Sequence, residues 1–302
     1  MLAGERFSYE EGEPSHISPP PSTDDSKIAV HVRCVGHSRA ITSMSFCSNE
    51  HQLVTSSIDK SVRFWGVDSG EMMKVFTDSS PVPTVLSLPQ NPNIIVASNS
   101  NGVLRLVNVA NGMVLQKIKP ESEVRALKFD TAEHVLFAGT KKGTIIVYEA
   151  LETLSMKVRF QKGNIGSGGI TCFEFVPASF GRPSLLLVSC SDSSLSIMYC
   201  IHSSTSLLTG LLVHRRLSVA HSLMPLKCCY SPSGQGYVIS GSEDKDVLIC
   251  SLAKSSDYKM SRLKHHQASV NAVAVNMQDT LLVSADSLGR IVFWRRMDFS
   301  HQ

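Results

Sequence analysis

TSSIDKSVRFW, residues Thr55–Trp65, decides the fold, because it places a hydroxyl side chain, an aspartate and an aromatic residue at fixed spacing. A Gly-His pair, Gly36 and His37, lies upstream of it. Serine or threonine, histidine and aspartate make up a nucleophilic catalytic triad, yet the same side chains also brace loops through buried hydrogen bonds. A triad is needed once in a chain, whereas a brace is needed in each copy of a repeated unit. Internal repeats therefore decide between chemistry and bracing.

The stretch recurs twice near the C-terminus. SGSEDKDVLIC, residues 240–250, aligns with it position for position. SADSLGRIVFW, residues 284–294, forms a third copy, and His266 precedes its tryptophan by 28 residues, the distance that also separates His37 from Trp65. This agreement predicts that the chain is built from repeats, so we interpret the polar residues as braces and not as a catalytic triad.

Weaker copies fill the middle of the chain. With the three strong copies they place one repeat position at residues 65, 107, 148, 198, 250 and 294, with steps of 41 to 52 residues. These steps indicate a repeat of about 40–45 residues with longer loops in places. Each copy contains alternating Val, Ile, Leu and Phe, broken by Gly, Ser, Asn and Asp, as half-buried strands require. No helical periodicity is convincing, so we predict an all-β fold.

These residues resemble the WD40 repeat family, whose signature is a Gly-His pair followed by a Trp-Asp close. The resemblance implies a WD40 β-propeller of four-stranded blades around a central channel. In that family a His before the first strand, a Ser or Thr in the second, an Asp in the next turn and a Trp in the third strand form a hydrogen-bonded brace. Carried across, the resemblance predicts these brace residues: His37, Thr55, Asp59, Trp65, His221, Ser240, Asp244, His266, Ser284 and Trp294.

Some repeats depart from this pattern. Cys250 stands where the fifth repeat should have its tryptophan, and Leu288 stands in the aspartate position of the sixth, with Asp286 two residues early. The three middle repeats have lost most of the set. Their blades should therefore rely more on the packing of apolar strands.

The chain divides into a tail and one domain. Residues 1–26 are rich in Pro, Ser and carboxylates, which predicts a disordered tail, and residues 27–298 are predicted to form the propeller. Six visible repeats give either a six-bladed ring, closed by a strand at 27–34 that pairs with the last repeat, or a seven-bladed propeller that lacks its first blade. A closer resemblance to one longer member of the family, carried by GHSRAITSMSF and VISGSEDKDVLIC, favours the second.

We expect no metal site and no cofactor. GNIGSGG, residues 163–169, has the glycine density of a phosphate loop, but lacks the GK[ST] ending and a following helix. His265 and His266 are adjacent, so their side chains point to opposite faces of an extended segment. The eight cysteines include no CxxC pair, which favours buried thiols over a zinc or disulfide framework.

Composition and sequence pattern argue against several classes of function. The net charge of +3 over 302 residues gives no electrostatic argument for nucleic acid. The first residues show no basic region followed by an apolar one, and the apolar runs have the length of strands, so we expect no signal peptide and no membrane contact. No cluster of His or carboxylates suggests an enzyme or a small-molecule substrate.

The resemblance implies a non-catalytic scaffold that presents loops to proteins or peptides, in the nucleus or the cytoplasm. Likeness to the longer relative favours the nucleus and a chromatin- or transcription-associated role. The alternatives are a propeller that contacts RNA or nucleosomes, and a propeller-based enzyme. The candidate partner-binding face comprises Ser38, Arg39, Lys60, Glu121, Glu123, Arg125, Lys141, Lys142, Lys245 and Gln267.

Overall fold

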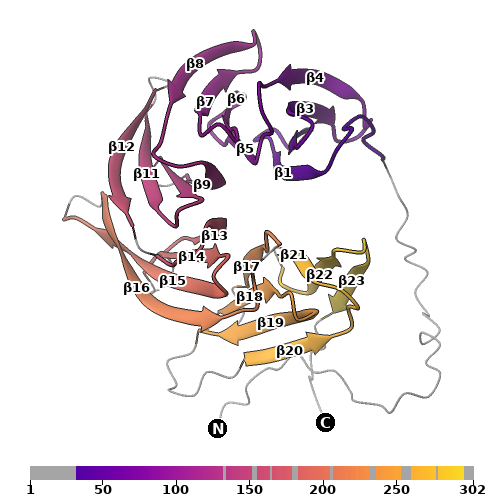
Figure 1. Ribbon diagram of the computed structural model, residues 1–302, viewed down its shortest axis with the longest axis vertical. Coiled ribbons are helices and arrows are strands. Elements are labelled where there is room, and N and C mark those ends of the chain that lie inside the picture. The colour runs from indigo at the N-terminus through magenta and orange to yellow at the C-terminus, as the bar shows by residue number, and fades with distance from the viewer. Residues whose placement is uncertain are drawn as a thin grey trace.

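The computed structural model contains only β-strands as regular elements in the residues that it describes, and these strands form six sheets. The sheets follow one another around a common axis in the order of the sequence, as the colours in Figure 1 show. The protein is thus a six-bladed β-propeller, as the repeats predicted. The described residues are 32–131, 134–151, 155–163, 165–178, 183–204, 207–222, 224–231, 236–252, 260–276 and 278–295.

Each of the first five blades is an antiparallel meander of four strands. Blade 1 contains β1 (Ile41–Phe46), β2 (Gln52–Ser57), β3 (Ser61–Gly66) and β4 (Met72–Thr77). Blade 2 contains β5 (Thr84–Leu88), β6 (Asn91–Ser98), β7 (Leu104–Asn108) and β8 (Met113–Ile118). Blade 3 contains β9 (Val124–Asp130), β10 (Val135–Thr140), β11 (Ile145–Leu151) and β12 (Ser155–Lys162).

The second half of the ring repeats the pattern with one exception. Blade 4 contains β13 (Ile170–Val176), β14 (Leu185–Cys190), β15 (Ser194–His202) and β16 (Leu208–Ser218). Blade 5 contains β17 (Cys228–Ser231), β18 (Tyr237–Gly241), β19 (Asp246–Ser251) and β20 (Met260–Lys264). Blade 6 has three strands, β21 (Val270–Val275), β22 (Leu281–Asp286) and β23 (Ile291–Arg295).

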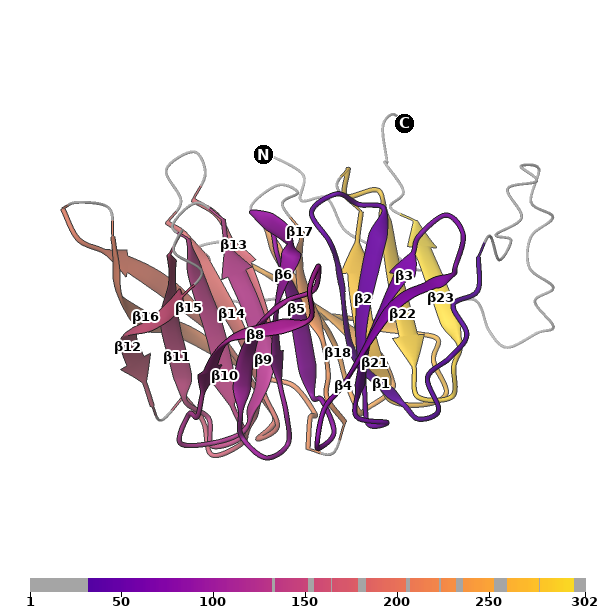
Figure 2. The same ribbon diagram turned by 90° about the horizontal axis from the view of Figure 1, so that it is seen from above.

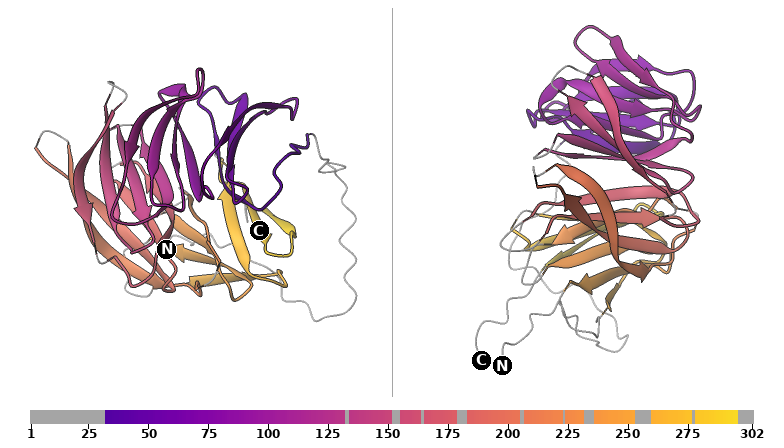
Figure 3. Two further views of the ribbon diagram at one scale, coloured as in Figure 1. Left: turned by 45° about the horizontal axis from the view of Figure 1, so that its top comes forward. Right: turned by 90° about the vertical axis from the view of Figure 1, so that its left-hand side faces the viewer.

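The first strand of each blade lies nearest the axis, where β1, β5, β9, β13, β17 and β21 contact one another in succession. The sheets stand roughly along the axis, as the view from above in Figure 2 shows. Figure 3 shows the ring obliquely and from the side. The repeat position predicted from the sequence falls in the third strand of every blade and is buried in the first five, at Trp65, Val107, Tyr148, Met198 and Cys250.

The hydrophobic core is divided among the junctions between blades. Five clusters of buried apolar side chains lie between blades 1 and 2, 2 and 3, 3 and 4, 4 and 5, and 5 and 6. Phe137 and Phe173, for example, pack across the junction of blades 3 and 4, with ring centroids 6.4 Å apart. Burial of this kind stabilises a fold by about 25 cal/mol per Å² of apolar surface. The blades are therefore held together pairwise, in sequence order.

No such cluster joins blade 6 to blade 1 in the described part of the chain. Side chains that would fill this junction are exposed, including Met44 (63%) and Phe46 (59%) on β1 and Ile291 (58%) and Phe293 (43%) on β23. The part of the ring formed by the described residues is therefore open at one junction. We call the space between blades 6 and 1, bounded by β1 and β23, the opening.

The predicted closing strand at 27–34 can be followed only in part, because residues 27–31 lie outside the described residues, as does the predicted tail at 1–26. Residues 32–34 belong to no strand, and Val32 and Arg33 lie beside Gly70, in the turn before β4. Blade 6 consequently has no fourth strand among the described residues. The described residues also include no helix long and apolar enough to cross a bilayer.

Candidate functional site

The loops at one end of each blade are tied together by a backbone hydrogen bond that recurs six times. In blade 1, the N–H of Ile58 in the turn after β2 donates to the carbonyl of Ala40 before β1, at 3.1 Å. The other five bonds measure 2.8–2.9 Å and join Ser100 to Pro81, Lys141 to Glu123, Ser191 to Gly169, Glu243 to Ala220, and Ser287 to Ser269. Because the strand order is the same in every blade, all these loops lie on one side of the ring.

We call this side the loop face. It consists of the segment before the first strand and the turn after the second strand of each blade. In chain order these paired segments are 37–40 with 58–60, 79–83 with 99–103, 119–123 with 141–144, 165–169 with 191–193, 219–222 with 242–245, and 265–269 with 287–290.

Each of these turns contains a residue with positive φ. Glycine holds the position in blades 2, 3 and 6, at Gly102, Gly143 and Gly289. Lysines hold it in blades 1 and 5, Lys60 with φ of 71° and Lys245 with φ of 72°, and Ser193 with φ of 63° holds it in blade 4. A non-glycine residue in this region is strained by roughly 1–2 kcal/mol. The geometry presents both lysines on the loop face, where their side chains are exposed.

The predicted brace of blade 1 is connected in the structure. His37 Nδ1 lies 2.8 Å from Asp59 Oδ2, and His37 Nε2 lies 2.7 Å from Thr55 Oγ1. The indole N–H of Trp65 donates to Thr55 Oγ1 at 2.8 Å. Asp59 can only accept, so Nδ1 of a neutral His37 carries the proton and Nε2 accepts from the Thr55 hydroxyl. The chain of bonds therefore runs from the indole through the hydroxyl and imidazole to the carboxylate.

Asp59 also orders the loops around it. Its carboxylate accepts from the backbone N–H of Ser38 at 3.1 Å, the backbone N–H of Ser61 at 2.9 Å and the hydroxyl of Ser61 at 2.6 Å. Burial raises the pKa of Asp59, but the hydrogen bonds from Ser61, His37 and Ser38 outweigh it and hold the pKa well below its usual range. The carboxylate thus joins the segment before β1 to the turn before β3.

In blade 6 the aspartate of the brace comes from a different position than the sequence alignment indicated. His266 Nδ1 lies 2.9 Å from Asp286 Oδ2, while His266 Nε2 lies 2.7 Å from Ser284 Oγ. The Trp294 indole donates to that serine at 2.8 Å. Asp286, two residues before the aligned position, therefore completes the brace, and Leu288 is 78% exposed.

Blade 5 departs from the prediction. His221 does not meet Ser240 and Asp244, but lies with Nδ1 3.2 Å from Ser189 Oγ and Nε2 3.3 Å from Thr171 Oγ1, both in blade 4. Asp244 instead pairs with Arg262 at 3.7 Å, and the hydroxyl of Ser240 donates to a neighbouring backbone carbonyl. The physical reason is Cys250, which stands where blades 1 and 6 have tryptophan. Cys250 has no indole N–H to donate to the Ser240 hydroxyl, so blade 5 lacks the bond that fixes this hydroxyl in the brace.

Other polar groups tie the loops where brace residues are missing, and they were not among the predicted brace residues, although the repeat alignment places Asp192 in the aspartate position of the fourth repeat. In blade 4, Asp192 accepts from the N–H of Ser167 at 2.8 Å and the hydroxyl of Ser194 at 2.6 Å. In blade 5, Glu243 accepts from the N–H groups of Ser222 and Met224, both at 2.8 Å. The sequence feature that could have indicated these substitutes is a carboxylate in or beside the turn before the third strand.

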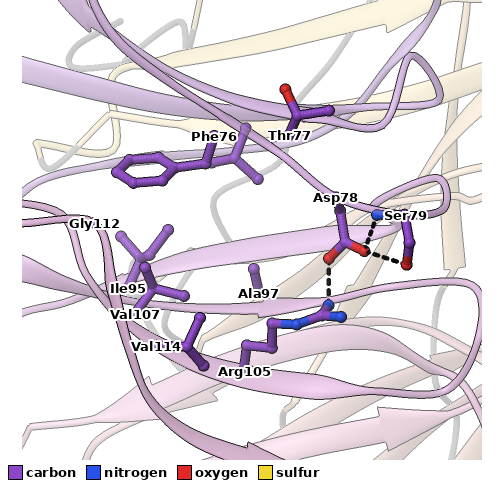
Figure 4. Close-up of a pocket in the computed structure, with 11 residues that line it drawn as sticks. Phe76, Thr77, Asp78, Ser79, Ile95, Ala97, Arg105, Val107, Gly112 and Val114 are labelled. Atoms are coloured by element: carbon purple, nitrogen blue, oxygen red, sulfur yellow. Dashed lines mark hydrogen bonds and ion pairs between the residues drawn. The ribbon is translucent and has the colours of Figure 1, made fainter.

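Blade 2 is tied to blade 1 by an ion pair beside a pocket of about 250 Å³. Asp78 accepts from Asn99 Nδ2 at 2.8 Å and forms an ion pair with Arg105. Figure 4 shows this pair and Ser79 at one side of the pocket, with Phe76 and Val107 among its apolar lining. The ion pair already satisfies the aspartate, so we interpret it as part of the junction.

The residues predicted for partner binding all lie on or beside the loop face. Eight are exposed, whereas Glu123 and Arg125 are half-buried and form an ion pair at 3.4 Å. The glycine-rich segment belongs to the same face, where Ser167 and Gly169 donate backbone N–H groups to the blade 4 turn. The eight exposed residues are Ser38, Arg39, Lys60, Glu121, Lys141, Lys142, Lys245 and Gln267.

The braces are arranged for support and not for chemistry. Thr55 is 4% exposed, and its oxygen is engaged by both His37 and Trp65. A nucleophile needs an open approach and an imidazole free to take its proton. Among the described residues, no group of three His, Cys, Asp or Glu side chains is placed to hold a metal ion, and no disulfide links the cysteines.

Comparisons with known proteins support the repeat interpretation. The model of the WD domain, G-beta repeat matches residues 29–66 and 258–295, which include the braces of blades 1 and 6. An uncharacterized WD repeat-containing protein of Schizosaccharomyces pombe is 24% identical over 226 residues, covering 72% of this chain and 37% of the relative. The COMPASS component SWD3 of Saccharomyces cerevisiae is 21% identical over 207 residues, covering 64% of each chain.

A solved structure shows the same fold. The β-propeller domain of Swd1 from Myceliophteria thermophila superimposes with a TM-score of 0.69 at 19% identity, covering 87% of this chain and 85% of the other. The chain spans little more than a third of the S. pombe relative, which is therefore a much longer protein.

Proposed function

We propose that this chain, a β-propeller that carries WD40 repeats, is a non-catalytic scaffold whose loop face binds proteins or peptides. The observation that carries the proposal is the sixfold tie between the loops, with a backbone bond of 2.8–3.1 Å in every blade. Such ties fix the backbone of the loops while leaving side chains such as Lys60 and Lys142 exposed. A surface that is ordered before binding loses less entropy on association.

The charge of the exposed residues favours a protein partner over a polyanion. Arg39 and four lysines on the loop face are exposed, but Glu121 lies among them and Glu123 neutralises Arg125. Binding to nucleic acid would be favoured by a continuous basic surface. We therefore propose a partner with acidic and polar side chains, recognised by several separate contacts.

The cellular setting is part of the same proposal. One relative is a COMPASS component, and the SWD3 comparison covers 64% of this chain. The closer sequence resemblance noted above is to WD repeat-containing protein 13, and it implies a nuclear scaffold associated with chromatin or transcription. Both favour a nuclear regulatory complex as the place of action.

A charge-reversal experiment tests the loop face. Lys60, Lys141 and Lys142 are changed together to Glu, and the control changes Lys117, Lys157 and Lys162, exposed lysines on the outer strands β8 and β12, in the same way. Tagged proteins are incubated with nuclear extract, and bound proteins are quantified by mass spectrometry against the unmodified chain.

We expect the loop-face variant to lose the proteins that the unmodified chain enriches, and the control variant to retain them. Both variants carry the same net charge, so a nonspecific electrostatic effect would change both equally. Equal loss in the two variants, or full retention by the loop-face variant, would contradict the proposal.

A further inference from the structure

Among the residues that the structure describes, β23 is the uncovered edge of a three-stranded sheet, whereas a fourth strand covers the third strand of every other blade. The N–H of Asp286 donates to the carbonyl of Arg290 at 3.0 Å, which fixes the hydrogen-bonding pattern between β22 and β23. Backbone groups of an antiparallel strand point alternately to its two sides. Those of Ile291, Phe293 and Arg295 therefore point away from β22, and no described residue pairs with them. This edge offers a row of donors and acceptors for another strand.

The side chains of β23 continue the apolar wall of the opening. Trp294 packs against the cluster between blades 5 and 6. Because side chains alternate along a strand, Ile291 and Phe293 point to the other side, and they are 58% and 43% exposed. Across the opening, Met44 and Phe46 on β1 are 63% and 59% exposed. A segment added to β23 would therefore bury apolar surface as well as pair its backbone.

Blade 1 shows what kind of segment fits. The sequence RIVFW, ending at Trp294, aligns with SVRFW, ending at Trp65. In blade 1 the covering strand β4 runs antiparallel, with Met72 opposite Trp65 and Phe76 opposite Val62. The pairing shifts register beside Trp65, and a shift at the same repeat position occurs in blades 2, 3 and 4. A strand on β23 should follow the same course past Trp294.

The charges at the two ends of β23 favour an acidic segment. Arg290 precedes the strand and Arg295 ends it, and both are exposed. The covering strand of blade 1 carries carboxylates at the corresponding places, because Glu71 precedes Met72 and Asp78 follows Thr77. Opposite charges at both ends would fix the direction and register of an added strand.

We propose that β23 binds, by strand addition, an extended segment of another polypeptide that has apolar side chains at alternate positions and a carboxylate near each end. The site lies at the opening and pairs through backbone groups of β23, so it is separate from the loop face except at Arg290, which belongs to both and donates to Gln267 at 3.2 Å. Failure at one surface therefore does not imply failure at the other.

The test uses a synthetic probe with the sequence of β4 and its flanking residues, GEMMKVFTDS, residues 70–79, carrying a fluorescein label. Its binding to the full chain is measured by fluorescence anisotropy. Ile291→Pro removes one outward N–H, at an edge position where proline is tolerated, and the matched control Ile291→Ala shortens the same side chain but keeps the N–H. Circular dichroism checks that both variants are folded to the same extent.

We expect saturable binding that Ile291→Pro weakens by about tenfold or more and Ile291→Ala by about threefold or less, because strand addition depends on main-chain bonds. Equal binding to both variants, or no binding to the unmodified chain, would overturn the proposal.

Two further results would identify a different occupant and also overturn it. Binding seen only after Ile28→Asp with Val30→Asp would mean that residues 27–31 of the same chain cover the edge. A dimer in sedimentation velocity that the probe converts to monomers would mean that a second copy covers it.

Discussion

At the scale of single residues, the brace of blade 1 makes a quantitative prediction. Thr55→Val keeps the shape of the side chain but leaves His37 Nε2 and the Trp65 indole N–H without their partner, in a site where Trp65 is 1% exposed. An unsatisfied buried polar group costs about 1–3 kcal/mol, so we expect the free energy of unfolding to fall by about that amount. Urea denaturation measures it. Thr77→Val, at an exposed position of the same blade, should change it by less than about 0.5 kcal/mol.

Asp59 predicts a dependence on pH. Its pKa is lower in the folded chain than the usual value, so the folded state binds this proton less readily than the unfolded state. The stability that the carboxylate contributes is therefore present above the unfolded pKa, about 4, and is lost as the pH falls through the folded pKa. We expect Asp59→Asn to be less stable than the unmodified chain at pH 7, and the difference to shrink as the pH falls below about 4.

Denaturant midpoints measured from pH 7 to pH 3 check this expectation. Asp68→Asn is the control, because the side chain of Asp68 is 84% exposed. If the difference in denaturant midpoint between Asp59→Asn and the unmodified chain stays constant across this pH range, ionisation of Asp59 does not support the fold.

At the scale of elements, the turns before the third strands carry a measurable strain. Gly289 has φ of 84° with no other atom near its would-be Cβ, so Gly289→Ala isolates the backbone effect. We expect it to lower the free energy of unfolding by about 1 kcal/mol, and Lys60→Gly to raise it by about 0.5–1 kcal/mol. Gly163→Ala, at an equally open site without positive φ, is the control. If Gly289→Ala and Gly163→Ala shift the midpoint temperature of thermal unfolding equally, the predicted backbone strain at residue 289 is wrong.

The elements also show what the sequence could predict. The repeat position, in the third strand of each blade, could be located from the sequence because the side chain there is subject to the same packing constraint in each copy. The fourth strands had no such signature, since strands such as β4 are largely exposed and tolerate many residues. The order and approximate boundaries of the blades were therefore predictable, but the outer edge of each was not.

The braces were predictable where all four side chain types are present, as in blade 1. His221 could not be placed from spacing, because its partners Ser189 and Thr171 belong to the preceding blade. Asp286 was missed as a brace residue because turn geometry, and not position in the alignment, brings its carboxylate to His266. Contacts between blades depend on how sheets pack, which a single sequence does not encode locally.

At the scale of the whole molecule, the opening predicts unequal costs for equivalent substitutions. Phe46 and Phe129 occupy the same position in the first strands of blades 1 and 3, but are 59% and 7% exposed. Phe129 belongs to the cluster between blades 2 and 3. We expect Phe129→Ala to cost about 3–5 kcal/mol and Phe46→Ala less than about 1 kcal/mol, measured by urea denaturation. Similar costs would mean that the ring closes in solution.

In the described part of the chain, six blades joined by five apolar clusters form a linear array with two ends, in the same sense as a solenoid of stacked repeats. Each inner blade is held by two neighbours, whereas blades 1 and 6 are each held by one. Local unfolding should therefore begin at the two ends and spread inward, and amide hydrogens should exchange fastest in the terminal blades. The two fully formed histidine braces, at His37 and His266, lie in these terminal blades. Each terminal blade packs against one neighbour instead of two, so hydrogen bonds within the blade matter most there.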